Sequence, residues 1–219
     1  MYETILFDLD GTLTDPGTGI TNSVTYALNK FGIEVKDKTE LYKFIGPPLH
    51  ESFEQYYGFS KEQAKTAVEY YREYYRDQGI FENLVYEGVE KLLKEMHDSG
   101  KTLIVATSKP ELFAKKILEH FGLAKYFIYI AGANMDGTRT KKDEVIAYAL
   151  EKGKISEYKT VVMVGDREHD VIGANKVGID SIGVLFGYGD YDELKSAGAT
   201  YIAECIEDIY PIVFDSFNV

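Results

Sequence analysis

The feature that most constrains the fold is a series of short apolar segments that alternate with helical patterns. Five segments have the length of β-strands: 5–9, 103–106, 127–131, 161–164 and 181–185. Their apolar character is continuous, which is typical of strands that are covered on both faces in a parallel sheet. Helical patterns precede or separate the later segments, at 88–98, 110–121, 142–152 and 170–177. This alternation predicts an α/β fold with a doubly wound, Rossmann-like parallel sheet.

One long interval departs from the alternation. Residues 16–84 show helical periodicity without a convincing strand, and the candidate helices cover 20–31, 39–44, 49–57 and 61–78. We therefore predict an all-helical domain at 16–84, inserted into an α/β core that comprises 1–15 and 85–219.

Composition limits the partners and the compartment. The 219 residues carry a net charge of −12, which argues against a nucleic-acid polymer or an anionic membrane as the main partner. Bringing an anionic substrate to such a chain requires cations at the site. Cys205 is the sole cysteine, so no internal disulfide can form. The sequence shows no signal peptide and no run of about 18 apolar residues. We therefore expect a cytoplasmic protein.

Two aspartates mark the end of the first predicted strand. Asp8 and Asp10 are two residues apart, so they share a face of the strand. The carboxyl end of a parallel strand is where ligands bind in open α/β sheets, and Gly11 allows a sharp turn there. Two close carboxylates repel each other unless a cation lies between them. A hard cation with oxygen ligands, most simply Mg²⁺, satisfies this need.

A second acidic pair follows the strand predicted at 161–164. Asp166 lies just beyond that strand, and Asp170 is one helical turn further on. If this strand neighbours the first one, four carboxylates converge on one metal ion.

These motifs together resemble the haloacid dehalogenase-like hydrolase superfamily. Its four motifs correspond to Asp8-Leu9-Asp10-Gly11-Thr12, to an apolar strand that ends at Thr107, to Lys141 or Lys142 before a helix, and to the segment 165–170. The helical insertion matches the cap domain of that superfamily. Within it, the chain looks most like the phosphoglycolate phosphatase-like branch.

The resemblance implies a Mg²⁺-dependent phosphatase that hydrolyses a small phosphate monoester, of the phosphoglycolate or 5′-nucleotide type, through an aspartyl phosphate. Asp8 would be the nucleophile. Asp10 would protonate the leaving oxygen and then activate water. Asp8, the backbone carbonyl of Asp10, and Asp166 would hold Mg²⁺, and Asp170 would support them.

Four residues are predicted to bind the phosphate: Thr107, Ser108, Lys142 and Gly11. Thr107 and the lysine would neutralise the phosphoryl oxygens in the transition state. Lys142 is preferred to Lys141 because it lies closer to the helical run that follows. Ser108 also begins a capping-box pattern that ends at Glu111, so we expect its hydroxyl to cap the next helix and to leave Thr107 for the phosphate.

Several alternatives stay open at this point. A sugar-phosphate mutase uses the same two aspartates, and a non-catalytic phosphate-binding or signalling protein can be built on the same fold. In the predicted cap, His50, Arg72 and Arg76 either reach the substrate or are solvated, with the arginines paired to Glu69 and Glu73. The expected partner is a small phosphorylated metabolite, and the chain is a monomer or a homodimer.

Overall fold

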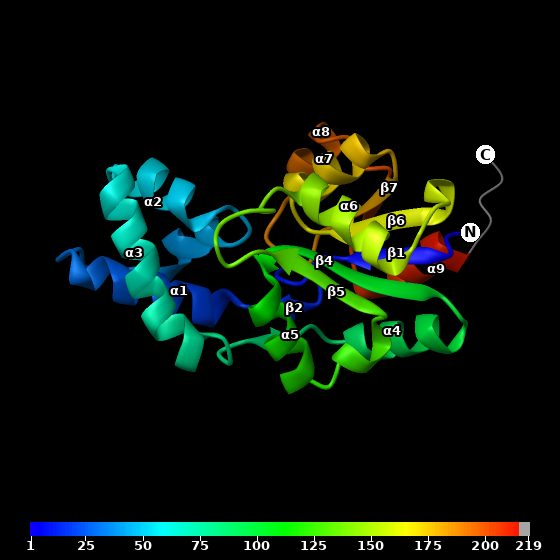
Figure 1. Cartoon of the computed structure of the whole chain (residues 1–219), viewed down its shortest axis with the longest axis horizontal. Helices are drawn as coiled ribbons and strands as arrows, with labels where there is room; N and C mark the ends of the chain where they lie inside the picture. The colour runs from blue at the N-terminus through cyan, green and yellow to red at the C-terminus, as the bar shows by residue number, and fades with distance from the viewer. Residues whose placement is uncertain (215–219) are drawn as a thin grey trace. The chain divides into compact units, whose positions relative to one another are not determined.

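A computed structural model describes residues 1–214 (Figure 1). The chain divides into two compact units. One contains residues 1–14 and the chain from Val85 onward, and the other contains Asp15–Leu84. No helix among the described residues is both long enough and apolar enough to cross a membrane.

The first unit is built on a parallel sheet. Six of the described strands form it, in the order β5-β4-β1-β6-β7-β8, and every pair of neighbours is parallel. The strands are β1 (Thr4–Phe7), β4 (Thr102–Pro110), β5 (Tyr129–Ala133), β6 (Val161–Gly165), β7 (Asp180–Val184) and β8 (Tyr201–Ala203). The predicted doubly wound sheet is confirmed. The strand order reverses beside β1, which is where ligands bind in such sheets.

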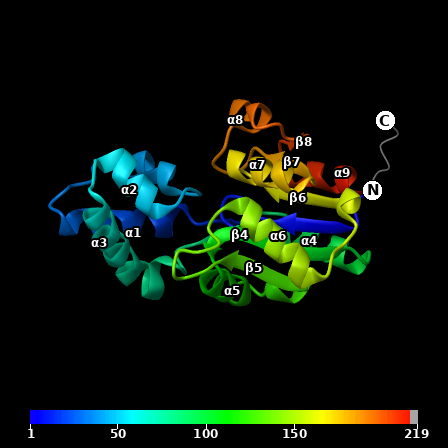
Figure 2. The ribbon, with the colours of Figure 1, turned by 45° about the horizontal axis from the view of Figure 1, so that its top comes forward.

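Helices cover both faces of this sheet. They are α4 (Val89–Asp98), α5 (Glu111–His120), α6 (Lys142–Gly153), α7 (Glu168–Val177), α8 (Tyr191–Ser196) and α9 (Ile209–Phe214). Helices α6 and α7 pack against each other and lie on the same side of the strands (Figure 2). Leu6 of β1 and Ile104 of β4 join the buried apolar cluster beneath α6. Phe7, the next residue of β1, contacts Phe127 edge to face, as expected from the alternation of side chains along a strand.

The second unit is helical. It comprises α1 (Gly17–Lys30), a 3₁₀ segment η1 (Lys38–Phe44), α2 (Leu49–Tyr57), α3 (Lys61–Tyr74) and a π-helical turn η2 (Tyr75–Gly79). Aromatic side chains form much of its core, among them Phe44 and Phe53, whose ring centroids are 5.1 Å apart. Strands β2 (Thr14–Asp15) and β3 (Leu84–Val85) pair where the chain passes between the units.

Helix α3 departs from the single helix expected over 61–78. Its start is confirmed, because Ser60 and Gln63 form a reciprocal capping box. Its α-helical hydrogen bonding gives way at Tyr75 to the wider π turn that ends at Gly79. Gly79 lies against α1 so closely that a Cβ atom on Gly19 would be 1.9 Å from the Gly79 carbonyl oxygen. This close approach is a tertiary contact that periodicity alone does not show.

Candidate active site

Asp8 and Asp10 lie in the loop that leaves β1. The Asp8 N–H donates to the Val164 carbonyl at 2.9 Å, so the ladder between β1 and β6 continues to Asp8. The chain then turns tightly around the Leu9 carbonyl, and Gly11 adopts a φ of +80°. A Cβ atom on Gly11 would lie 2.1 Å from Asp166 Oδ2. Gly11 thus allows both the turn and the approach of the second acidic loop.

Asp166 and Asp170 come from the loop between β6 and α7 and from the first turn of α7. Each is only 1% exposed. Asp166 Oδ2 accepts the Tyr188 N–H at 2.8 Å, and Asp170 Oδ2 accepts the Arg167 N–H at 3.1 Å. A Cβ atom on Gly165 would lie 2.2 Å from Asp170 Cγ. A glycine at the end of β6 is therefore needed for the Asp170 side chain to fold back against the strand.

Three carboxylates converge at this edge of the sheet. Oxygens of Asp8, Asp166 and Asp170 all lie within 4.8 Å of one another. The Asp10 carboxylate is not in this group, which differs from the expected convergence of four carboxylates. Its Oδ2 instead pairs with Lys109 Nζ. The role predicted for Asp10 in metal binding uses its backbone carbonyl, and that role stays a prediction.

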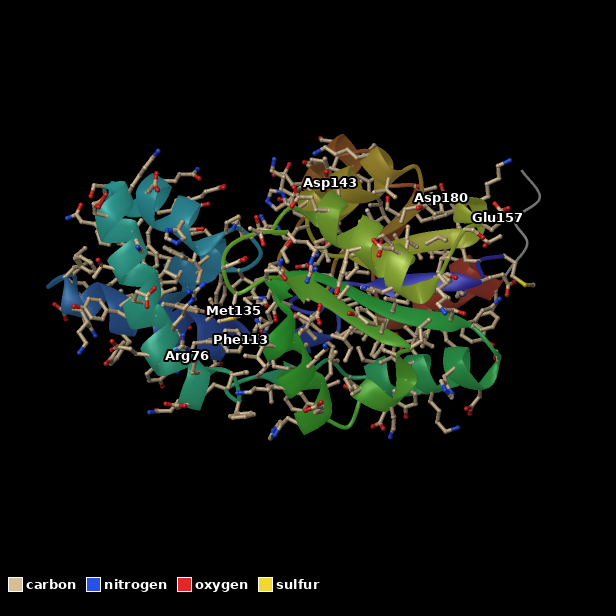
Figure 3. All side chains as sticks on the ribbon, in the orientation of Figure 1. Arg76, Phe113, Met135, Asp143, Glu157 and Asp180 are labelled. Atoms are coloured by element: carbon tan, nitrogen blue, oxygen red, sulfur yellow. The ribbon has the colours of Figure 1, made fainter. Side chains whose placement is uncertain are left out.

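Lys142 is the first residue of α6 and joins the acidic group. Its Nζ lies 2.9 Å from Asp8 Oδ1 and 2.7 Å from Asp170 Oδ1, and it donates to the Ala106 carbonyl at 3.2 Å. The adjacent Lys141 is exposed. In Figure 3, the label of Asp143 locates the start of α6, at the carboxyl ends of the strands. The label of Asp180 locates the start of β7, at their amino ends.

The acidic group is short of positive charge. Burial raises the pKa of Asp166 well above its usual range, and the charges of Asp170 and Asp8 add to the rise. Burial also raises the pKa of Asp170 to about 6, although Lys142 opposes it. Burial lowers the pKa of Lys142, but the charges of Asp170 and Asp8 outweigh this effect and raise it.

A divalent cation fits this set of donors. Three carboxylates against one ammonium leave an excess of two negative charges. Asp166 Oδ1 is buried and has no hydrogen-bond partner among residues 1–214. A hard cation that prefers oxygen ligands would satisfy both conditions.

Thr107 and Ser108 lie in an irregular extension of β4. The register between β4 and β5 shifts between Ala106 and Pro110. Thr107 is buried, and its Oγ1 accepts the Lys109 N–H at 3.2 Å. The N-cap of α5 is Pro110, without a side-chain cap, so the prediction that Ser108 caps this helix is wrong. The reason is that β4 continues through Ser108 and Lys109, and the helix begins only at Glu111.

Lys109 is a site residue that the sequence reasoning missed. Its side chain is 6% exposed, and it forms the ion pair with Asp10. Burial raises the pKa of Asp10, and the charge of Lys109 opposes this rise. A signal was available, because Lys109 follows Thr107 by two residues, the same spacing that places Asp8 and Asp10 on one face of a strand.

Three residues of the helical unit, His50, Arg72 and Arg76, are sequence-based candidates for substrate binding. His50 and Arg76 are exposed, and Arg72 is half-buried (Figure 3 labels Arg76). Within residues 1–214 no ion pair joins either arginine to Glu69 or Glu73. The expected pairing of the arginines is therefore not observed.

Comparison with known proteins places these motifs in a family. The family model described as haloacid dehalogenase-like hydrolase matches residues 5–184. A 5′-nucleotidase from Pseudomonas aeruginosa is 47% identical over 91% of this chain and 90% of its own length. The tyrosine-protein kinase PtkA from Mycobacterium tuberculosis is 41% identical over 90% of this chain and 67% of its own length. The crystal structure of a predicted phosphatase from Clostridium acetobutylicum has a TM-score of 0.93 and 52% identity, covering 97% of this chain and 98% of that one.

The chain therefore belongs to the haloacid dehalogenase-like hydrolase family, as its four motifs predict. Its class of activity within that family is phosphoric monoester hydrolysis.

Proposed function

We propose that the chain is a Mg²⁺-dependent phosphatase that hydrolyses small phosphate monoesters through an aspartyl phosphate on Asp8. One observation carries the proposal. The carboxylates of Asp8, Asp166 and Asp170 lie together, and Lys142 contacts two of them. The residues proposed as nucleophile, cation ligands and phosphate-binding lysine thus lie together at the carboxyl ends of the strands.

The residues that would hold Mg²⁺ are Asp8, Asp166 and the backbone carbonyl of Asp10, with Asp170 in support. When bound, the ion would neutralise the phosphoryl oxygens and the nucleophile so that the two anions can approach. Lys142 and Thr107 would contact the other phosphoryl oxygens, together with Ser108 and the backbone around Gly11. The burial of Lys142 strengthens its electrostatic effect.

The reaction has two steps at phosphorus. In the first, a carboxylate oxygen of Asp8 bonds to phosphorus, the bond to the ester oxygen breaks, and Asp10 gives its proton to that oxygen. In the second, a water oxygen bonds to phosphorus, its proton passes to Asp10, and the bond from Asp8 to phosphorus breaks. Inorganic phosphate leaves, and both aspartates return to their starting states.

Nucleoside 5′-monophosphates are the substrate class that we favour, with phosphoglycolate next. The support is the 47% identity to a 5′-nucleotidase across nearly the whole chain, compared with 25% identity to a phosphoglycolate phosphatase from Vibrio parahaemolyticus. We also propose that the helical unit acts as a cap that restricts the site to small molecules.

The test is phosphate release from 5′-nucleotides, phosphoglycolate, sugar phosphates and pyrophosphate, with Mg²⁺ or with EDTA. Wild type, Asp8→Asn and Lys94→Met are compared. The exposed side chain of Lys94 on α4 pairs with Asp98, so Lys94→Met is a control for a change at the surface. Release that requires Mg²⁺ and is lost only in Asp8→Asn is expected. Equal release by Asp8→Asn and wild type would contradict the proposal.

Transfer of the phosphoryl group to an acceptor other than water is a second candidate, favoured by the 41% identity to PtkA. A sugar-phosphate mutase belongs to the same class of reaction. The two outcomes differ in where the phosphoryl group is found. Hydrolysis yields one inorganic phosphate per ester consumed, whereas transfer places the phosphoryl group on a sugar hydroxyl or a tyrosine.

A further inference from the structure

Lys109 holds one side of the Asp10 carboxyl group. Its buried ammonium pairs with Asp10 Oδ2. The other oxygen, Asp10 Oδ1, is buried and has no hydrogen-bond partner among the described residues. The carboxyl group therefore has one oxygen fixed by a cation and one oxygen that remains available for another group.

The backbone of Lys109 is fixed on both sides. Its N–H donates to Thr107 Oγ1 at 3.2 Å. Its carbonyl oxygen lies so close to β5 that a Cβ atom on Gly132 would be 2.6 Å away. Pairing between β4 and β5 resumes at the next residue, Pro110, opposite Ala133. These contacts hold the lysine in the irregular end of β4 and so restrict where its ammonium can lie.

The two buried lysines of the site contact different carboxylates. Lys142 contacts Asp8 and Asp170, on the side where the phosphoryl group would bind. Lys109 contacts Asp10, the residue proposed to exchange a proton with the leaving oxygen. The phosphate-binding role of Lys142 therefore does not explain Lys109.

We propose that Lys109 is a positioning residue that holds the Asp10 carboxyl group so that Oδ1 faces the leaving oxygen of the ester. The inference rests on the proposed function of Asp10. In the first step the ester P–O bond breaks, and the proton moves from Asp10 Oδ1 to the oxygen that leaves. Lys109 keeps its own proton throughout and acts through Asp10.

This role predicts that Lys109 matters most for poor leaving groups. An alkoxide, such as the one a nucleoside 5′-monophosphate releases, needs a proton as it leaves, whereas p-nitrophenolate does not. General acid catalysis contributes about 10²- to 10⁴-fold. Lys109→Met should therefore lower kcat/KM roughly 10- to 100-fold for a nucleoside 5′-monophosphate and no more than about threefold for p-nitrophenyl phosphate. The quantity kcat/KM is chosen because it reports the steps up to loss of the leaving group.

A double-mutant cycle tests whether Lys109 acts through Asp10. In the Asp10→Asn background, Lys109→Met should change kcat/KM for the nucleotide by less than about twofold, because the proton donor is already lost. Lys109→Arg should recover part of the wild-type preference between the two esters, since it retains a cation at this position. Lys94→Met serves as the charge-matched control on the surface.

The outcomes separate this inference from the proposed function. An equal loss for both esters, or full additivity with Asp10→Asn, would overturn the positioning role of Lys109. Absence of Asp8-dependent release in the wild type would instead refute the proposed function. If circular dichroism shows that Lys109→Met does not fold, Lys109→Gln and Gly132→Ala are assayed with the same two esters. The Cβ atom of Gly132→Ala would meet the backbone of both Lys109 and Glu111, and we expect the same selective loss in the folded variant. An equal loss for both esters in these variants would refute the inference.

Discussion

Replacing Asp170 by asparagine should stabilise the metal-free protein at neutral pH, although it removes a carboxylate from the acidic group. Asp170 is 1% exposed. Burial and the nearby charge of Asp8 raise its pKa from 3.8 to about 6, against the opposing charge of Lys142. Asparagine keeps an oxygen for the Arg167 N–H, which Asp170 Oδ2 accepts in the wild type. The substitution therefore removes the charge and retains the helix-start hydrogen bond.

The sign and size of the effect follow from proton linkage. Because the pKa is higher in the folded state than in the unfolded state, folding is favoured when Asp170 is protonated, and that advantage is lost as the pH rises from about 4 through 6. A rise from 3.8 to about 6 corresponds to about 3 kcal/mol at 1.36 kcal/mol per pH unit. About 2 kcal/mol of this falls between pH 4.5 and pH 8.

Urea denaturation in EDTA measures the difference. The free energy of unfolding of the wild type, minus that of Asp170→Asn, should fall by about 2 kcal/mol when the pH is raised from 4.5 to 8. At pH 8, Mg²⁺ at about 100 times the wild-type Kd should stabilise the wild type by about 2.7 kcal/mol, and it should stabilise the variant by less. If the free energy of unfolding had the same pH dependence in both proteins in EDTA, the argument that burial and the charge of Asp8 destabilise the Asp170 carboxylate would be refuted.

Four further substitutions probe other parts of the site and the fold. Lys142→Met should lower kcat/KM about 10²- to 10³-fold, as loss of an oxyanion-stabilising donor does. Lys141→Met should change kcat/KM by no more than about twofold, because Lys141 is exposed. Similar losses in both variants would argue against Lys142 as the phosphate-binding lysine. Gly11→Ala should weaken Mg²⁺ binding in a titration followed by thermal unfolding, because its Cβ would displace Asp166, and unchanged affinity would count against the proposed site. Ser60→Ala should destabilise the start of α3 by about 1 kcal/mol, which would appear as faster amide hydrogen exchange in its first turn. Exchange rates equal to those of the wild type would show that the capping box contributes little.

The parts of the fold and site that the sequence predicts are those fixed by local pattern. The first five strands of the sheet have continuous apolar segments. Asp8, Thr107 and Asp166 follow three of these segments directly, and Lys142 follows β5 after a loop. Placing Asp8 and Asp166 at one edge requires only that β1 and β6 be parallel neighbours, as they are. The preference for Lys142 over Lys141 agrees with its position, because the first residue of α6 points its side chain at the strand ends.

The parts that were not predicted depend on tertiary contacts. Strand β8 is a short edge strand with few residues to show a pattern. Ser108 matches a capping box by sequence, but β4 pairs with β5 at Ala106 and again at Pro110, on either side of Ser108. The segment between them therefore stays in the strand, and Ser108 does not cap the helix. The side chain of Asp10 turns toward Lys109, a partner 99 residues away in the chain. The two-residue spacing from Thr107 places Lys109 on the same face of the strand, but nothing within either segment indicates that Asp10 is its partner.

The most direct test of the central claim is to find the phosphoryl group on Asp8 itself. The wild type would be mixed with Mg²⁺ and a nucleoside 5′-monophosphate, quenched in acid within a single turnover, digested and analysed by mass spectrometry, with Asp8→Asn as the control. The account predicts a phosphorylated N-terminal peptide, with the acyl phosphate on Asp8, that forms and decays as inorganic phosphate appears. Phosphate release in the first turnover without any phosphorylated Asp8, or with the phosphoryl group on another residue, would contradict it.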